Sequence, residues 1–214
     1  MQSIALIDYG SGNLRSAEKA LQRASRELGG AREVVTTDDP DIIARADRVV
    51  LPGVGAFAAC MRALEARPGV VEAIGEAVVS RGAPFLGVCV GMQLLADRGL
   101  EFGETAGLGW IAGEVRRLQP DGSFFKVPHM GWNALEAVAD HPLFDGLPPG
   151  AHMYFTHSFA LYPADPAEAV AQTDHGGRFT AAVARDNIAG VQFHPEKSQA
   201  AGLSLLANFL EWRP

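Results

Sequence analysis

The amino-acid sequence predicts an α/β fold: an open, mostly parallel sheet flanked by helices, with an antiparallel β annex. In the first half of the chain, short apolar runs alternate with segments of helical periodicity. Such alternation is typical of a parallel sheet covered on both faces. From Trp110 onward, strand-like runs follow one another with little helical pattern between them, which indicates antiparallel pairing. No linker or repeat interrupts the 214 residues, so we expect a single domain over residues 1–214.

Each expected element is defined by its pattern and its boundaries. The apolar run at residues 4–7 precedes a glycine-rich turn, and apolar residues then recur at helical spacing over residues 14–28. Short buried strands are next expected at 34–35, 49–51 and 85–88, and helices at 55–66 and 69–80. The second half predicts strands at 111–118, 124–127, 132–138, 154–161, 169–172, 181–184 and 188–193, and a last helix at about 199–212.

Composition and charge exclude several classes of function. The formal net charge is −7, and no basic run is present that would neutralise nucleic-acid phosphates. The apolar stretch after Met1 is too short for a signal peptide, so neither secretion nor membrane insertion is expected. Cys60 and Cys89 match neither a disulfide framework nor a structural zinc spacing. We therefore expect a reducing, cytoplasmic setting and no metal.

Cys89 lies where a buried strand meets a helical pattern, in a turn flanked by Gly87 and Gly91. Glycine on both sides lets the chain bend sharply and present one side chain at the carboxyl end of the sheet, as in a nucleophile elbow. Backbone amides at the start of the following helix favour the thiolate form and can also donate to an oxyanion. A buried core cysteine is the alternative, and it remains the interpretation for Cys60, which has no such glycines.

A cysteine nucleophile needs a proton carrier, and His194 fits best among the six histidines. It ends a strand pattern and precedes Pro195, so its side chain is expected at the carboxyl edge of the sheet. If the chain stays extended, Glu196 faces the same way and can accept from one imidazole nitrogen. On spacing alone, a proline turn with an exposed acid fits equally well. The remaining histidines are less favoured; His129 and His157 stay ambiguous, and His141, His152 and His175 are expected at turns, strand ends or loops.

Several motifs together resemble one known family. The segment from Gly87 to Gln93 and the segment from His194 to Glu196 resemble the triad, or class I, glutamine amidotransferases, which have a flavodoxin-like α/β fold. Residues 8–13, 51–57, 127–133 and 154–159 are similar to the glutaminase subunits of imidazole glycerol phosphate synthases. The resemblance covers nearly the whole chain.

The resemblance implies a catalytic triad. Cys89 would attack the side-chain amide of L-glutamine and form a glutamyl thioester that water then hydrolyses. His194 would carry the protons, and Glu196 would hold its ring.

The resemblance also implies an oxyanion hole and a glutamine site. The backbone amide of Val90 and one amide of the loop Gly53, Val54 and Gly55 would bind the oxyanion, and this loop is expected to need a peptide reorientation first. Gln93 and the backbone of Ser158 and Phe159 would contact the substrate.

A partner chain is implied because ammonia released into water at neutral pH becomes ammonium, which cannot attack. The sequence offers no phosphate cradle, and Gly10-Ser11-Gly12 lacks the third glycine and the acid of a dinucleotide loop, so no cofactor is expected. By resemblance, the acceptor is a (β/α)₈-barrel cyclase subunit of histidine biosynthesis, bound as a heterodimer. Interface candidates are Asn13, Met130, Trp132 and Lys197.

Two alternatives remain open at the level of sequence. The chain is also compatible with a glutaminase subunit that serves anthranilate, aminodeoxychorismate, guanylate or pyridoxal phosphate synthesis, since these share the cysteine elbow. A catalytically silent binding module of the same fold is the second alternative. The presence of Cys89, His194 and Glu196 together argues against a silent module.

Overall fold

A central eight-stranded sheet organises the chain in the computed structural model, which describes residues 2–30, 32–122 and 124–214. The strand order is β2-β1-β3-β4-β14-β13-β12-β9. The five parallel strands are β2 (Arg32–Thr37), β1 (Gln2–Ile7), β3 (Arg48–Gly53), β4 (Phe85–Cys89) and β14 (Ile188–Val191). The antiparallel strands are β13 (Arg178–Arg185), β12 (Ala169–Asp174) and β9 (Ala137–Val138).

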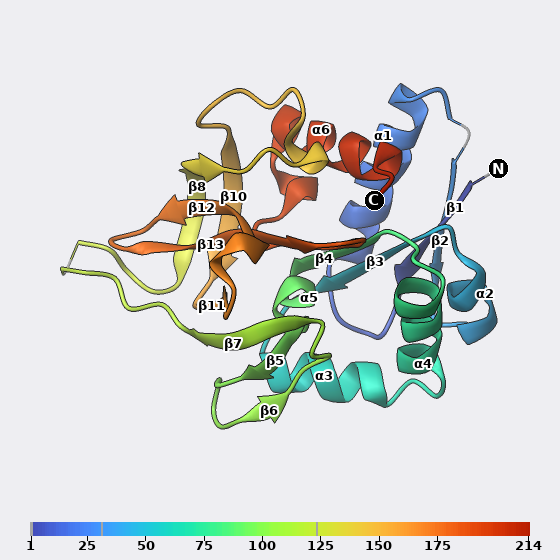
Figure 1. The fold of residues 1–214 in the computed structure, drawn as a ribbon, viewed down its shortest axis with the longest axis horizontal. Helices are drawn as coiled ribbons and strands as arrows, with labels where there is room; N and C mark the ends of the chain where they lie inside the picture. Colours follow the sequence, from blue (N-terminus) through green and yellow to red (C-terminus); the bar gives the residue numbers. More distant parts are fainter. Residues whose placement is uncertain (1, 31, 123) are drawn as a thin grey trace.

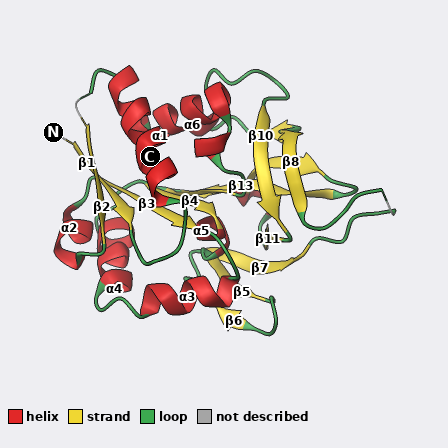
Figure 2. Cartoon of the chain, turned by 180° about the vertical axis from the view of Figure 1, so that it is seen from behind, coloured by secondary structure: helices red, strands yellow, loops and turns green. Residues whose placement is uncertain are grey.

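Helices cover both faces of the parallel strands, which confirms the fold class that the sequence predicts (Figures 1 and 2). α1 (Leu14–Glu27) and α6 (Gln199–Glu211) pack together on one face. α3 (Phe57–Glu65) and α4 (Val70–Gly75) lie on the other, with α2 (Pro40–Arg45) against α4. β3, β4 and β14 are buried along their whole length because they lie between these layers. In the described part of the chain, no helix has the length and apolar character needed to cross a membrane.

Two smaller sheets form the annex beside the central sheet (Figure 1). The first has the order β11-β7-β5-β6, and its strands are β11 (Phe159–Pro163), β7 (Ile111–Arg117), β5 (Ala96–Gly99) and β6 (Thr105–Ala106). The second is a ribbon of β8 (His129–Ala134) and β10 (His152–His157). The annex is antiparallel apart from the β5–β7 pair, which is parallel, and β9 joins the central sheet instead.

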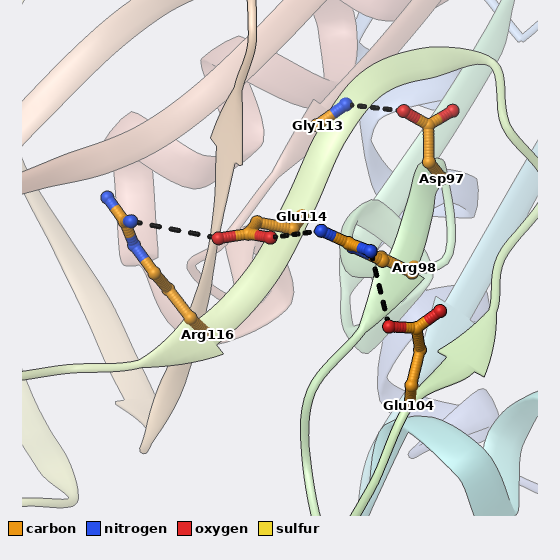
Figure 3. A network of polar contacts seen from close by, with 6 residues as sticks. All are labelled: Asp97, Arg98, Glu104, Gly113, Glu114 and Arg116. Carbon is orange, nitrogen blue, oxygen red and sulfur yellow. Dashed lines mark hydrogen bonds and ion pairs between the residues drawn. The ribbon is translucent and has the colours of Figure 1, made fainter.

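Ion pairs connect the strands of the first annex sheet (Figure 3). Arg98 on β5 contacts Glu104 and Glu114, each at 3.2 Å, and Arg116 contacts Glu114 at 3.7 Å. The amide of Gly113 donates to Asp97 at 2.9 Å. Most of these side chains are solvent-exposed, so each ion pair contributes little to stability.

The structure corrects several details of the expected elements, and β5 and β6 were not expected from the sequence. Residues 124–127 form no strand; Phe125 lies in a loop and packs edge-on against His175, and the segment continues into Pro128, which has no amide to donate. The runs at 132–138 and 154–161 are each divided between two strands. The helix after Cys89 is a single turn, α5 (Val90–Gln93), because the carbonyls of Leu94 and Leu95 accept from annex amides at 2.8–3.0 Å.

Candidate active site

The carboxyl ends of three neighbouring strands meet at one edge of the central sheet. β3 ends at Gly53, β4 ends at Cys89, and β14 leads into His194. Parallel order brings these ends together, as at the ligand sites of other open α/β sheets. A cavity of about 320 Å³ opens there. It is lined by Val54, Gly55, Cys89, Val90, Gln93, Glu101, Pro128, Thr156, His157, Ser158, Phe159, His194 and Lys197.

Cys89 occupies a strained backbone position between β4 and α5. Its φ is 56° and its ψ is −112°, a conformation that costs a non-glycine residue on the order of 1–3 kcal/mol. The elbow is crowded on both sides: a Cβ on Gly87 would lie 2.5 Å from the carbonyl oxygen of Gly91, and a Cβ on Gly91 would lie 1.9 Å from that of Leu51. Glycine is therefore required at both positions, and the tight bend places Cys89 at the cavity.

His194 and Glu196 form a buried pair across from this elbow. The Nδ1 atom of His194 lies 2.8 Å from Oε1 of Glu196, and the two side chains are 3% and 5% exposed. A 3₁₀ turn at Pro195–Lys197 makes this contact, rather than the extended chain that the sequence suggested. Burial lowers the pKa of His194, but the proximity of Cys89 and Glu196 outweighs burial and raises the pKa to about 9. Among the described residues, Nε2 of His194 has no hydrogen-bond partner. His194 is therefore suited to hold a proton beside a thiolate.

The loop that follows β3 is held by side chains from two other segments. The hydroxyl of Tyr9 donates to the Pro52 carbonyl at 2.8 Å. Ser11 donates to the Val54 carbonyl at 2.8 Å and accepts from the Val54 amide at 3.3 Å. The Sγ of Cys60 also donates to the Val54 carbonyl at 3.4 Å. The Val54 amide is thus engaged with Ser11, whereas Val90, the other expected oxyanion donor, directly follows Cys89 and lines the cavity.

The three residues expected to contact glutamine all line the cavity. Gln93 is buried, and its Nε2 donates to the Phe159 carbonyl at 2.9 Å and to Oε1 of Gln192 at 3.0 Å. Ser158 separates β10 from β11, and its carbonyl accepts from the amide of Leu118 at 2.9 Å.

The four interface candidates are exposed, and two of them, Trp132 and Lys197, lie on the same ring, that of Tyr154. Lys197 lines the cavity, with its Nζ 5.7 Å from the Tyr154 ring centroid. Met130 and Trp132 are two positions apart on β8 and are 65% and 46% exposed. Asn13 precedes α1, and its carbonyl accepts from the amides of Ser16 and Ala17 in that helix.

Glu101 and Gln192 were not identified by sequence reasoning. Glu101 lies on the loop after β5, lines the cavity, and accepts from the Phe57 amide at 2.8 Å. No motif surrounds it in the sequence. Gln192 is fully buried, and its Nε2 lies 3.7 Å from the Sγ of Cys89. A usable signal existed for Gln192, because residues two apart on a strand face the same side and His194 follows at that spacing.

Comparison with known proteins adds independent information. The family described as "Glutamine amidotransferase class-I" matches residues 5–212. The chain is 63% identical over 214 residues to "Imidazole glycerol phosphate synthase subunit HisH" of Caulobacter vibrioides, covering 100% of both chains. It is 58% identical over 212 residues to the protein of the same description from Rhodospirillum rubrum, covering 99% of each.

Solved structures of low sequence identity share the fold. A structure described as a glutamine amidotransferase gives a TM-score of 0.69 at 19% identity, covering 97% of both chains. The structure of a putative GMP synthase component from Thermoplasma acidophilum gives a TM-score of 0.65 at 23% identity, covering 99% of this chain and 93% of that one.

Proposed function

Because this chain belongs to the class I glutamine amidotransferase family, we propose that it is the glutaminase subunit of an imidazole glycerol phosphate synthase in histidine biosynthesis. The observation that carries the proposal is the full-length identity to relatives of that description. The whole chain acts as one amidotransferase domain. The reaction converts L-glutamine and water into glutamate and ammonia.

The chemistry begins at Cys89. Its thiolate attacks the side-chain amide carbon of glutamine and forms a C–S bond, and the negative charge moves to the amide oxygen. His194, which took the thiol proton, returns it to the departing nitrogen as the C–N bond breaks and ammonia leaves. His194 then removes a proton from water, which attacks the thioester, and the proton returns to sulfur as glutamate is released. Glu196 fixes the tautomer of His194 through the contact at 2.8 Å.

The far end of the cavity binds the amino-acid end of glutamine. Backbone amides of Ser158 and Phe159 donate to the α-carboxylate. The carboxylate of Glu101 faces the α-ammonium group, because it is an acidic side chain at the cavity wall. Both hydrogen bonds made by Gln93 use its Nε2, so its Oε1 accepts from the substrate.

The oxyanion hole combines the Val90 amide with an amide of the loop Gly53, Val54 and Gly55. The Val54 amide donates to Ser11, so it must be released before it can serve. One missing donor of this kind lowers kcat by about 10²–10³-fold. The resting chain is accordingly a slow glutaminase, and loop rearrangement activates it.

The acceptor of the ammonia is a cyclase subunit with a (β/α)₈ barrel, which binds this chain as a heterodimer. Binding close to the cavity keeps ammonia from becoming ammonium in bulk water. Met130 and Trp132 on β8, with Val54 and Lys197 at the cavity, form the contact surface, because large apolar side chains are exposed there. Cytoplasmic localisation follows from the need to keep the Cys89 thiol reduced.

Glutamate release by the purified chain tests this function, measured alone and with the cyclase subunit plus its ribonucleotide substrate. We expect slow hydrolysis by the chain alone and a rise of about 10²-fold or more in the complex. Activation by the partner of a different synthase, and not by this cyclase, would assign the chain to another amidotransferase. If no mixture hydrolysed glutamine, the glutaminase function would be refuted and the chain would be a catalytically silent binding module.

A further inference from the structure

Gln192 is a buried side chain in contact with the nucleophile that the proposed chemistry leaves without a role. It follows β14, and its backbone amide donates to the Ala181 carbonyl at 2.8 Å. The side chain is 0% exposed, and its Nε2 lies 3.7 Å from the Sγ of Cys89. A buried carboxamide is costly unless its polar atoms are bonded, so its contacts define its orientation.

The carbonyl of Phe159 fixes the orientation of two glutamine side chains in series. This oxygen only accepts, so Gln93 must present its Nε2, at 2.9 Å. The other Nε2 proton of Gln93 points to Gln192 at 3.0 Å, and the atom that receives it must be the carbonyl oxygen of Gln192. The opposite end of the Gln192 carboxamide, its NH₂ group, therefore faces Cys89. A flipped Gln192 would place two donors together at one end and an oxygen against a thiolate at the other.

Two histidines continue this series of hydrogen bonds, in which each donor and acceptor is fixed, on the other side of the Phe159 carbonyl. His157 donates from Nδ1 to the same carbonyl at 2.9 Å, which leaves its Nε2 to accept from Nδ1 of His129 at 3.3 Å. The Nε2 of His129 in turn accepts from Asn133 at 3.3 Å. Burial lowers the pKa of His157 to about 3 and that of His129 to about 4, so both rings are neutral and hold these single tautomers. The Phe159 carbonyl is thus fixed by donors from two sides.

The thiolate has few other sources of stabilisation in this elbow. α5 contains only four residues, so its dipole is weak compared with that of a full helix. His194 supplies a positive charge but must give its proton to ammonia during the reaction. A neutral amide donor keeps its proton throughout, and it stabilises an anionic acceptor about twice as strongly as a neutral one.

We propose that Gln192 is a further catalytic residue, which donates a hydrogen bond from its carboxamide to the Cys89 thiolate and is oriented for this by Gln93. This inference rests on the proposed glutaminase function, in which Cys89 must be a thiolate before it attacks. Gln192 gains and loses no proton; the thiol proton still passes to His194. Its hydrogen bond favours the thiolate and holds the Sγ at the cavity.

The test compares Gln192→Met with wild type and with Gln172→Met. Methionine keeps the length of the side chain and removes the donor, and Gln172 is a half-buried glutamine of β12 outside the cavity. Iodoacetamide labelling of Cys89 is followed by mass spectrometry from pH 5 to pH 10. We expect the pH midpoint of labelling to rise by about one unit in Gln192→Met, as loss of one hydrogen bond to a charged group predicts. In the complex with the cyclase subunit, kcat should fall about tenfold while KM changes little.

Because labelling of Cys89 needs no glutamine, the experiment can refute the role of Gln192 without refuting the glutaminase function, and the reverse also holds. A midpoint that coincides with wild type in a folded Gln192→Met chain would overturn the role of Gln192. A wild-type chain that never hydrolyses glutamine would overturn the function and leave the labelling result intact. If Gln192→Met does not fold, the side-chain amide resonances of Gln192 in ¹⁵N-labelled wild type decide. If Gln192 has this role, the chemical shifts of these resonances change with pH at the labelling midpoint, and the change is absent in Cys89→Ala. Chemical shifts that do not change across the labelling midpoint would refute the role.

Discussion

Two walls of the same cavity differ in how completely they are built. The wall formed by the ends of β4 and β14 carries Cys89 and His194, and Gln192 contacts Cys89 without lining the cavity; all three side chains are buried. The wall formed by the loop after β3 includes Val54, which is 42% exposed, with its amide turned to Ser11. For the proposed function, the nucleophile wall is therefore already in place apart from a hydrogen bond to Nε2 of His194, whereas the proposed oxyanion donor Val54 is bonded to Ser11.

If the proposed function holds, this difference predicts that activation acts on the loop after β3. A rearrangement of the nucleophile wall would disturb a fully buried polar network, which is costly. A rearrangement at Val54 breaks the two solvent-exposed hydrogen bonds to Ser11 and one part-buried hydrogen bond from Cys60. Because one such bond contributes only about 0.5–1.5 kcal/mol, contact with a partner chain can supply the free energy needed to break these bonds.

The largest effect is expected from removing the nucleophile itself. Cys89→Ala should lower glutamine hydrolysis by about 10⁴-fold or more in the complex, because no other group forms the thioester. The same complex supplied with ammonium salt at high pH should still make the cyclase product, since the substitution is small and buried. Residual glutamine hydrolysis near the wild-type rate would show that the assembled wall is not the catalytic one.

A smaller effect is expected from releasing the loop. Ser11→Ala removes both hydrogen bonds that Ser11 makes to Val54, at 2.8 Å and 3.3 Å. We expect the glutaminase rate of the chain alone to rise about tenfold and the rate in the activated complex to change less. Ser16→Ala on α1 is the matched control, because it removes a hydroxyl outside this contact. A resting rate unchanged by Ser11→Ala, measured as glutamate release, would mean that Ser11 does not restrain the loop.

The smallest effect on catalysis, and a clear one on stability, is expected from the buried histidine His157, which lines the cavity beside Ser158 and Phe159. Burial lowers the pKa of His157 to about 3 from an ordinary value of 6.5. Below pH 6.5 the unfolded chain binds a proton there that the folded chain does not, so stability falls as pH falls from 6.5 toward 3. Between pH 6.5 and pH 4.5 this one group costs about 2–3 kcal/mol of unfolding free energy.

His157→Gln removes that titration and keeps a side-chain donor. Its unfolding free energy, measured by urea denaturation, should therefore fall less between pH 6.5 and pH 4.5 than that of wild type. His152→Gln, an exposed position on the same strand, should behave as wild type. Equal acid sensitivity of His157→Gln and wild type would contradict the burial of a neutral ring at this position.

The sequence predicted the parts of the site that backbone geometry constrains. Gly87 and Gly91 marked the elbow because no Cβ fits there, and Pro195 marked the turn that begins directly after His194. The helices and parallel strands could also be predicted, because the spacing of apolar residues that marks each of them lies within one short segment.

Features that depend on tertiary pairing were not predictable in this way. β5 was not predicted. The length of the helix after Cys89 was overestimated, because annex amides donate hydrogen bonds to the carbonyls of Leu94 and Leu95. Glu101 lies at the cavity only because β5 places its loop there. Residues 124–127 have a strand-like composition, yet their aromatic side chains pack in a loop.

One measurement tests the difference between the two walls most directly. The rate constants of Cys89 labelling by iodoacetamide and of glutamine hydrolysis are measured together, for the chain alone and for the complex with the cyclase subunit and its ribonucleotide. The account predicts that hydrolysis rises by about 10²-fold or more, as expected for gaining an oxyanion donor, while the labelling rate stays within a few-fold. A labelling rate that rises in parallel with hydrolysis would contradict it, because activation would then assemble the nucleophile rather than the oxyanion hole.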